Sequence, residues 1–230
     1  MIKCSEINIE LTNVCTMNCD FCSLSELTRS NSFMNDEIFY KTADDIINNN
    51  LTDLILPYLM GESLLHKKWF EYISYLTNKT KNSKTDINLI TNGAHLDSNT
   101  LNLLCKTNLN HLFISVQQWD QAGYYKRKIK KNISFEEYNK SITNAVKIFT
   151  RETDIKISLY YLISTSNDAQ IFLGNGYIDS NNKGYSILNK WFQFFKENEI
   201  NTYPLEEILK LQNNAEHEIG LTDRFSIIFK

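Results

Sequence analysis

The sequence predicts an α/β protein, organised as a (βα)6 partial TIM-type barrel with parallel strands. Short apolar segments of strand type alternate with longer segments whose apolar residues recur at helical spacing. This alternation is typical of βα units, in which helices cover a parallel sheet. Six strand segments are found, fewer than the eight that close a full barrel. We therefore expect a barrel with a lateral opening.

Each strand is predicted from alternating or continuous apolar residues bounded by polar or turn-forming ones. The six strands are expected at residues 7–11, 51–56, 86–90, 111–116, 155–163 and 225–229. Parallel α/β proteins bind their ligands where the carboxyl ends of the strands meet. The segments that follow each strand are therefore the expected location of a site.

Helices are predicted between the strands from capping residues and apolar stripes. The clearest follows Ser134, which forms a capping box with Glu137 and precedes an apolar stripe. Other helices are expected after Asn35 or Asp36, around residues 69–76, at 98–106 and 187–197, and from Pro204 to residue 211. Residues 165–185, with several Gly, Asn and Ser, are interpreted as a lid over the open side of the barrel.

With 230 residues, the chain is expected to form a core over residues 1–164, which residues 165–230 complete. The longest apolar run, residues 54–60, is interrupted by Pro57 and too short to span a bilayer, so no membrane contact is expected. The first residues form no continuous apolar leader, and clustered cysteines suit a reducing cytoplasm.

The charge pattern argues against nucleic acid as a partner. The net charge is −3, and both signs are spread along the chain. One basic cluster, residues 126–131 with the sequence KRKIKK, is interpreted as a solvated face rather than a phosphate-binding surface.

Three of the five cysteines, Cys15, Cys19 and Cys22, lie within eight residues directly after the first predicted strand. A disulfide framework is typical of short secreted chains with an even cysteine count. A structural zinc site needs a fourth ligand, and the next histidine is His66. Three thiolates on one loop suit a [4Fe-4S] cluster, and they leave one iron open for chemistry.

The spacing C-x3-C-x2-C, with Phe21 just before the last cysteine, resembles the radical S-adenosylmethionine (radical SAM) superfamily. The resemblance implies that Cys15, Cys19 and Cys22 bind a [4Fe-4S] cluster, and that its open iron binds SAM. An electron from a donor such as flavodoxin or ferredoxin then cleaves SAM to a 5′-deoxyadenosyl radical, which abstracts hydrogen from a substrate. The partial barrel is also the core fold of this family.

Two further motifs extend the resemblance. The segment Gly61-Glu62-Ser63 after the second strand resembles a GGEP motif that holds the SAM amino group, although Met60 and Ser63 depart from it. Asn92, in a Thr-Asn-Gly turn after the third strand, resembles a turn that borders the ribose and methionine of SAM. Outside the family, each segment is an ordinary turn.

Ser115 and Arg127 complete the set of expected SAM contacts. They resemble a Ser and Arg pair that binds the SAM carboxylate and ribose in peptide-modifying members, and a guanidinium can bind a carboxylate through two hydrogen bonds. The alternative for Arg127 is a solvated surface cation. By resemblance, the predicted cofactor-binding residues are Phe21, Gly61, Glu62, Asn92, Ser115 and Arg127.

The motifs look closest to the peptide-modifying branch, so a peptide or protein side chain is the expected substrate. Those members commonly carry a Cys-rich C-terminal extension of the SPASM or twitch type, whereas no cysteine follows Cys105 in this sequence. Alternatives are a small-molecule natural-product intermediate, a glycyl-radical activase, a non-catalytic iron–sulfur or SAM-binding regulatory module, and a zinc-stabilised domain.

Overall fold

The computed structural model describes residues 3–19, 21–118, 120–130, 132–162, 181–204 and 218–229. Within these residues, the strands form an open sheet in the order β1-β2-β3-β4-β5-β7-β6. All neighbouring strands pair in parallel except β6 and β7, which are antiparallel. The predicted α/β fold with six parallel strands is confirmed.

The strands match the predicted positions, with one addition. They span Ile7–Asn8 (β1), Leu54–Leu56 (β2), Asp86–Thr91 (β3), His111–Gln117 (β4), Lys156–Tyr161 (β5), Glu218–Gly220 (β6) and Phe225–Phe229 (β7). Strand β6 is the addition, because its three residues, ending in a glycine, carry neither a clear alternation nor an apolar run that would predict a strand. Strand β1 is shorter than residues 7–11, although Ile9 still donates a backbone hydrogen bond to Leu56 at 2.8 Å.

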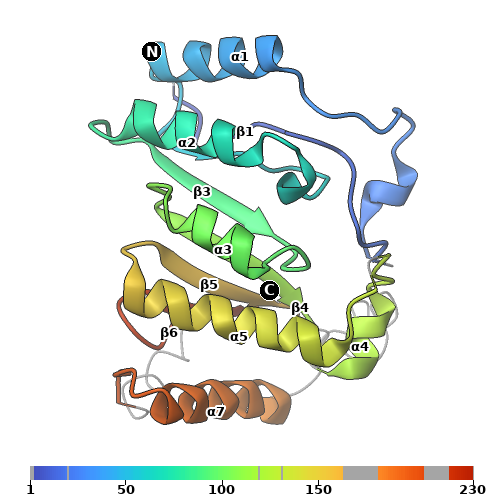
Figure 1. Ribbon diagram of the computed structural model, residues 1–230, viewed down its shortest axis with the longest axis vertical. Helices are drawn as coiled ribbons and strands as arrows, with labels where there is room; N and C mark the ends of the chain where they lie inside the picture. The colour runs from blue at the N-terminus through green and yellow to red at the C-terminus, as the bar shows by residue number, and fades with distance from the viewer. Residues whose placement is uncertain are drawn as a thin grey trace.

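The described helices lie on one side of the sheet (Figure 1). They span Asp36–Asn48 (α1), Trp69–Thr80 (α2), Ser98–Leu104 (α3), Gln121–Lys126 (α4), Phe135–Glu152 (α5) and Asn181–Glu197 (α7), with short 3-10 helices at Ser23–Glu26 (η1) and Ser63–Leu65 (η2). Helix α4 was expected to be loop, and α7 begins six residues before the predicted start. No helix among the described residues is long and apolar enough to cross a membrane.

Two predictions fall largely outside the described residues. Most of the proposed lid, at 165–185, lies within residues 163–180, and the helix expected after Pro204 lies within residues 205–217.

The core lies between the sheet and the helices. The predicted capping box of α5 is present, and its apolar stripe is buried, including Tyr138, Ile142 and Phe149. Alternate residues of a strand point to opposite faces, and in β4 the residues Leu112 and Ile114 are fully buried beneath the helices.

The opposite face of the sheet, called the inner face here, is polar and aromatic. His111 stacks on Phe113 with ring centroids 3.8 Å apart, and Phe113 stacks on Tyr160 at 5.1 Å. Below them, Ser158 shares hydrogen bonds of 2.6 Å with His111 and with Ser226. The inner face of the partial barrel therefore offers hydrogen-bonding groups and rings for contact with a ligand.

Candidate functional site

The predicted site residues come from segments that follow four successive strands. Residues 12–22, called the Cys loop here, follow β1, while Gly61 and Glu62 follow β2. Asn92 follows β3, and Arg127 ends α4 after β4. Because these strands are parallel, their carboxyl ends lie at the same edge of the sheet, where α/β proteins bind their ligands.

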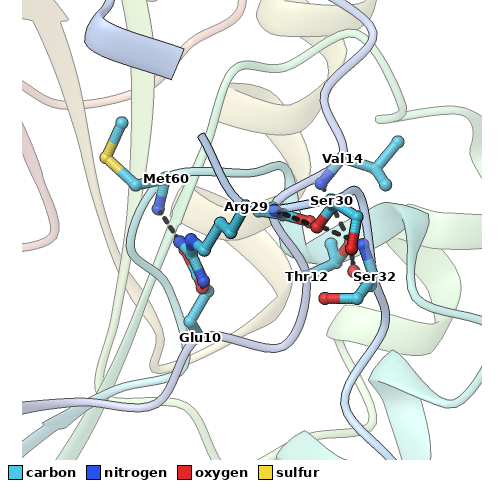
Figure 2. A network of polar contacts seen from close by, with 8 residues as sticks. Glu10, Thr12, Val14, Arg29, Ser30, Ser32 and Met60 are labelled. Carbon is cyan, nitrogen blue, oxygen red and sulfur yellow. Dashed lines mark hydrogen bonds and ion pairs between the residues drawn. The ribbon is translucent and has the colours of Figure 1, made fainter. Parts of the chain in front are cut away.

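The Cys loop is anchored by the segment that follows its last cysteine (Figure 2). Arg29 forms a two-pronged ion pair with Glu10, and the same carboxylate accepts a hydrogen bond of 3.3 Å from the amide of Met60. The hydroxyl of Thr12 donates to the carbonyl of Ser32 at 2.7 Å. These contacts fold residues 29–32 back onto the chain before the cysteines, so both ends of the loop are fixed.

Cys15, Cys19 and Cys22 are free thiols and half-buried, so the disulfide alternative is not supported. The sulfur of Cys15 accepts hydrogen bonds from the amide of Met17 at 3.4 Å and from the side chain of Asn92 at 3.5 Å. Burial raises the pKa of Cys15 and Cys19 above the ordinary thiol value. The charge of Cys19 adds to the rise in the pKa of Cys15, and the charge of Cys22 adds to the rise in the pKa of Cys19, as expected for neighbouring thiols.

The arrangement differs from a site for one ion. Among the described residues, no group of three or more His, Cys, Asp or Glu side chains is placed to hold a single metal ion. A cubane cluster does not require such a group, because each cysteine binds a different iron and the ligands stand farther apart.

Glu62 joins the loops after β2 and β3 to the Cys loop. Its side chain is 2 % exposed and accepts hydrogen bonds from the Leu64 amide at 3.2 Å, the Thr91 hydroxyl at 3.0 Å and the Asn92 amide at 2.7 Å. Its own backbone amide donates to the carbonyl of Val14 at 2.8 Å. Burial raises the pKa of this carboxyl group, while the three donors oppose the shift. The carboxylate is therefore not a surface group but a buried acceptor whose hydrogen bonds connect the loops after β2 and β3.

Gly61 allows the loop after β2 to pack directly on the Cys loop. A Cβ atom at this position would lie 2.1 Å from the carbonyl oxygen of Thr12 and 2.8 Å from that of Val14. Any other residue would push these two loops apart. The structure thus gives Gly61 a packing role, and a contact with SAM remains a prediction.

Asn92 lies at the centre of the site. Besides its contacts with Glu62 and Cys15, its side-chain oxygen accepts a hydrogen bond from Ala94 at 2.9 Å, and its carbonyl accepts one from the Tyr138 hydroxyl at 2.9 Å. The following residue, Gly93, has a φ of 82°, as the predicted turn requires.

Arg127 is buried, so the alternative of a solvated surface cation is wrong. Its Nη1 atom donates to the Val116 carbonyl at 2.8 Å, the Gln118 side chain at 3.0 Å and the Tyr138 hydroxyl at 3.1 Å. Its guanidinium also interacts with the thiol of Cys19 and opposes the rise in the pKa of that thiol. The buried charge thus faces a predicted cluster ligand.

Two donors, one on Arg127 and one on the neighbouring Gln118, have no hydrogen-bond partner among the described residues. The Nε atom of Arg127 and the Nε2 atom of Gln118 are both buried without a hydrogen-bond partner, although each belongs to a side chain that is 2 % exposed. A buried donor is costly unless it is paired. Such donors, on and beside the guanidinium that faces Cys19, fit a group rich in acceptors, as the sulfurs of an iron–sulfur cluster or the carboxylate of SAM would be.

The other two predicted contacts are Ser115 and Phe21. Ser115 is on the inner face of β4, where its register partner is Tyr160, just before a β-bulge. Phe21 is half-buried in the Cys loop. Gln118 and Tyr138, which contact Arg127, are site residues that were not predicted from the sequence. Tyr138 looked like one more position of an apolar stripe, and only its hydroxyl distinguished it.

Comparisons with known proteins agree with this geometry. The profile of the Radical SAM superfamily matches residues 9–171. No curated protein sequence matches the chain.

Solved structures share the fold at low sequence identity. Streptococcus suis SuiB bound to S-adenosylmethionine has a TM-score of 0.56 at 16% identity, covering 86% of this chain and 39% of SuiB. SuiB bound to the precursor peptide SuiA has 0.55 at 16%, covering 92% and 45%. Methylornithine synthase (PylB) has 0.50 at 16%, covering 73% and 48%. This chain thus spans less than half the length of both of these proteins.

Proposed function

Because the chain belongs to the radical SAM superfamily, whose enzymes use a [4Fe-4S] cluster and SAM, we propose that Cys15, Cys19 and Cys22 hold that cluster. The reaction would be reductive cleavage of SAM, followed by hydrogen abstraction from a peptide or protein side chain. When bound, the cluster and SAM supply the one-electron chemistry that yields the 5′-deoxyadenosyl radical.

One observation supports the proposal most directly. Two separate side chains converge on the thiols of the motif, Asn92 on Cys15 and Arg127 on Cys19. Hydrogen bonds to ligand sulfurs and nearby positive charge stabilise an anionic cluster and set its potential. The chain's own residues therefore provide the surroundings that such a cluster needs.

The inner face supports the placement of substrate beside the site. Phe113 and Tyr160 form a stacked aromatic surface on the side of the sheet opposite the described helices. Burial raises the pKa of Tyr160, so its hydroxyl stays protonated and can donate a hydrogen bond. This surface would orient substrate and exclude water from the radical.

The substrate class is the finer part of the proposal. A peptide is favoured because the chain shares its fold with SuiB, which has been observed with a precursor peptide. A small-molecule intermediate is the second candidate, since methylornithine synthase has the same fold. We also propose a cytoplasmic location, where five free thiols remain reduced.

The test is anaerobic reconstitution with iron and sulfide, reduction with dithionite, and measurement of 5′-deoxyadenosine with and without candidate substrates encoded nearby. We expect SAM cleavage in the wild type that a matching peptide stimulates. A bound cluster with no 5′-deoxyadenosine after reduction would instead indicate a regulatory module. Stimulation by small molecules and not by peptides would overturn the peptide assignment alone.

A further inference from the structure

The hydroxyl of Tyr138 joins the two residues that contact the predicted cluster ligands. It donates a hydrogen bond of 2.9 Å to the carbonyl of Asn92 and accepts one of 3.1 Å from Nη1 of Arg127. A phenol donates one hydrogen bond and can accept another, so both contacts are made at once. The side chain of Asn92 reaches the sulfur of Cys15, and the guanidinium of Arg127 faces Cys19. A single hydroxyl group therefore links the contacts to two of the three cysteines.

The environment of Tyr138 keeps this hydroxyl protonated. The side chain is 1% exposed, and burial raises the pKa of the phenol, although the charge of Arg127 opposes the rise. Only the protonated form can donate to the Asn92 carbonyl. The hydroxyl is therefore fixed as a donor to one residue and an acceptor from the other.

The start of α5 determines where the hydroxyl lies. Ser134 and Glu137 form the capping box, and the amide of Tyr138 donates to the Ser134 carbonyl at 3.0 Å. The first turn of α5 lies beside α4 (Figure 1), and Arg127 is the residue that ends α4. Asn92 follows β3. Tyr138 thus connects a helix start, a helix end and a strand end that are separate in the sequence.

Packing alone does not require a hydroxyl at this position. The other buried residues of the stripe on α5, such as Ile142 and Phe149, are apolar, and the ring of a phenylalanine would fill the same space. The turn after β3 also packs closely against the helix, because a Cβ on Gly93 would lie 3.2 Å from the Tyr138 oxygen and 2.7 Å from Ile142. A buried hydroxyl is costly unless it is paired, and here both partners belong to the candidate site.

The two linked contacts act on the cluster in the same direction. Reduction adds negative charge, which the guanidinium of Arg127 and the hydrogen bond from Asn92 both stabilise. Arg127 has two further acceptors, the Val116 carbonyl at 2.8 Å and the Gln118 side chain at 3.0 Å. Loss of the Tyr138 hydroxyl would therefore displace the guanidinium without releasing it, and its effect should be smaller than loss of the charge itself.

We propose that Tyr138 is a positioning residue for the cluster, whose hydroxyl holds Asn92 and Arg127 against the cysteines and thereby raises the reduction potential. The inference rests on the proposed function, because only a cluster bound to these cysteines has a potential to be adjusted. Tyr138 acts through its two partners, so removal of its hydroxyl changes the surroundings of the cluster and leaves its ligands in place.

The test variant is Tyr138→Phe, which removes the hydroxyl and keeps the ring. The matched control is Tyr72→Phe in α2, where the tyrosine is also fully buried and its hydroxyl donates to Asp36 at 2.7 Å. Arg127→Gln is prepared alone and combined with Tyr138→Phe. Iron content and the reduction potential, from redox titration followed by electron paramagnetic resonance, are measured for each reconstituted protein. Urea unfolding is measured for each apo-protein.

We expect Tyr138→Phe to bind as much iron as the wild type, while its equilibrium constant for one-electron reduction falls about threefold, which corresponds to about 30 mV. Tyr72→Phe should keep the wild-type potential, although it also loses a buried hydrogen bond. Tyr138→Phe should lower the potential less in the Arg127→Gln background than in the wild type, because part of its effect passes through Arg127. The urea midpoints of the same four proteins should show the same coupling without the cluster.

A wild-type potential in Tyr138→Phe would overturn the inference, as would equal decreases in Tyr138→Phe and Tyr72→Phe. Strictly additive effects of Tyr138→Phe and Arg127→Gln on the potential would also overturn it. Failure of the proposed function is separate, because it appears in the wild type, as a protein that binds no four-iron cluster or that does not cleave SAM after reduction.

Discussion

The backbone amide of Asn92 donates a hydrogen bond of 2.7 Å to the buried carboxylate of Glu62. The same carboxylate binds the hydroxyl of Thr91, and the Asn92 side chain reaches the sulfur of Cys15. Glu62 thus fixes a residue that contacts a predicted cluster ligand. Its hydrogen bonds hold the loops after β2 and β3 in place, and this effect can be measured as stability of the protein without SAM.

Replacing Glu62 by Ala should destabilise the protein by about 3 kcal/mol, because three buried donors lose their acceptor. Urea unfolding of the apo-protein measures the loss. Glu62→Gln keeps one acceptor oxygen, so its free energy of unfolding should lie between those of the wild type and Glu62→Ala. An unchanged urea midpoint in Glu62→Ala would contradict the conclusion that hydrogen bonds to the carboxylate hold the loops together.

Gly61→Ala should reduce the iron bound after reconstitution, because the new Cβ would collide with the backbone before the cysteines. The matched control is Gly184→Ala in α7, where a Cβ meets nothing within 4 Å and helix propensity should rise. Iron content and urea midpoint are compared for both variants. Normal iron binding in Gly61→Ala would show that the two loops can separate without cost.

Replacing Cys15, Cys19 and Cys22 together by Ala should abolish the roughly four irons and four sulfides that one cubane requires. Cys105→Ala is the control, since Cys105 follows α3 near the amino ends of the strands, away from the Cys loop. Iron and sulfide analysis with the absorption spectrum decides the result. Full iron retention in the triple variant would refute the cluster assignment.

Arg127→Gln should lower the reduction potential of the cluster by about 60 mV, because a buried positive charge beside Cys19 favours the added electron. Arg127→Lys keeps the charge and should retain most of the potential. Redox titration followed by electron paramagnetic resonance measures both. SAM affinity, measured in parallel, tests the contact implied by the family resemblance, whose loss should cost about 2 kcal/mol. An unaltered reduction potential in Arg127→Gln would contradict the expected effect of the Arg127 charge on the cluster.

Acid should destabilise the wild type through His111. Burial, assisted by the charge of Lys156, lowers the pKa of His111 to about 4 in the folded protein, whereas the unfolded chain has the ordinary value near 6.5. As the pH falls, His111 is therefore protonated in the unfolded chain before it is protonated in the folded protein. The contribution of neutral His111 to the free energy of unfolding is complete above pH 6.5 and is lost as the pH falls toward 4.

The loss should amount to about 3 kcal/mol in the wild type and be absent in His111→Gln. Urea unfolding between pH 7 and pH 4.5 measures it as the difference between the two proteins. If the free energy of unfolding depended on pH in the same way in both proteins, the lowered pKa of His111 would be contradicted.

The resemblance to the family could be predicted because it depends on residues that are close together in the sequence. The three cysteines follow a strand at short spacing, and the strands and helices alternate in order, so neither depends on distant contacts. The profile match at residues 9–171 covers the stretch in which the motifs were found. The strand β6 and helix α4 were missed because their segments are short and polar, and packing rather than periodicity stabilises them.

The parallel α/β fold, the order of its elements and the candidate cluster ligands could be predicted from the sequence, because apolar periodicity and ligand spacing are properties of neighbouring residues. The contacts that Gly61, Glu62 and Arg127 make around those ligands could not, and they became known from the packed structure. It buried Glu62 among three donors, pressed Gly61 against the Cys loop and turned the guanidinium of Arg127 toward Cys19. Apart from the contact of Glu62 with Leu64, these contacts join residues 29 to 108 positions apart, and they follow from how the strands and loops pack, which no local pattern records.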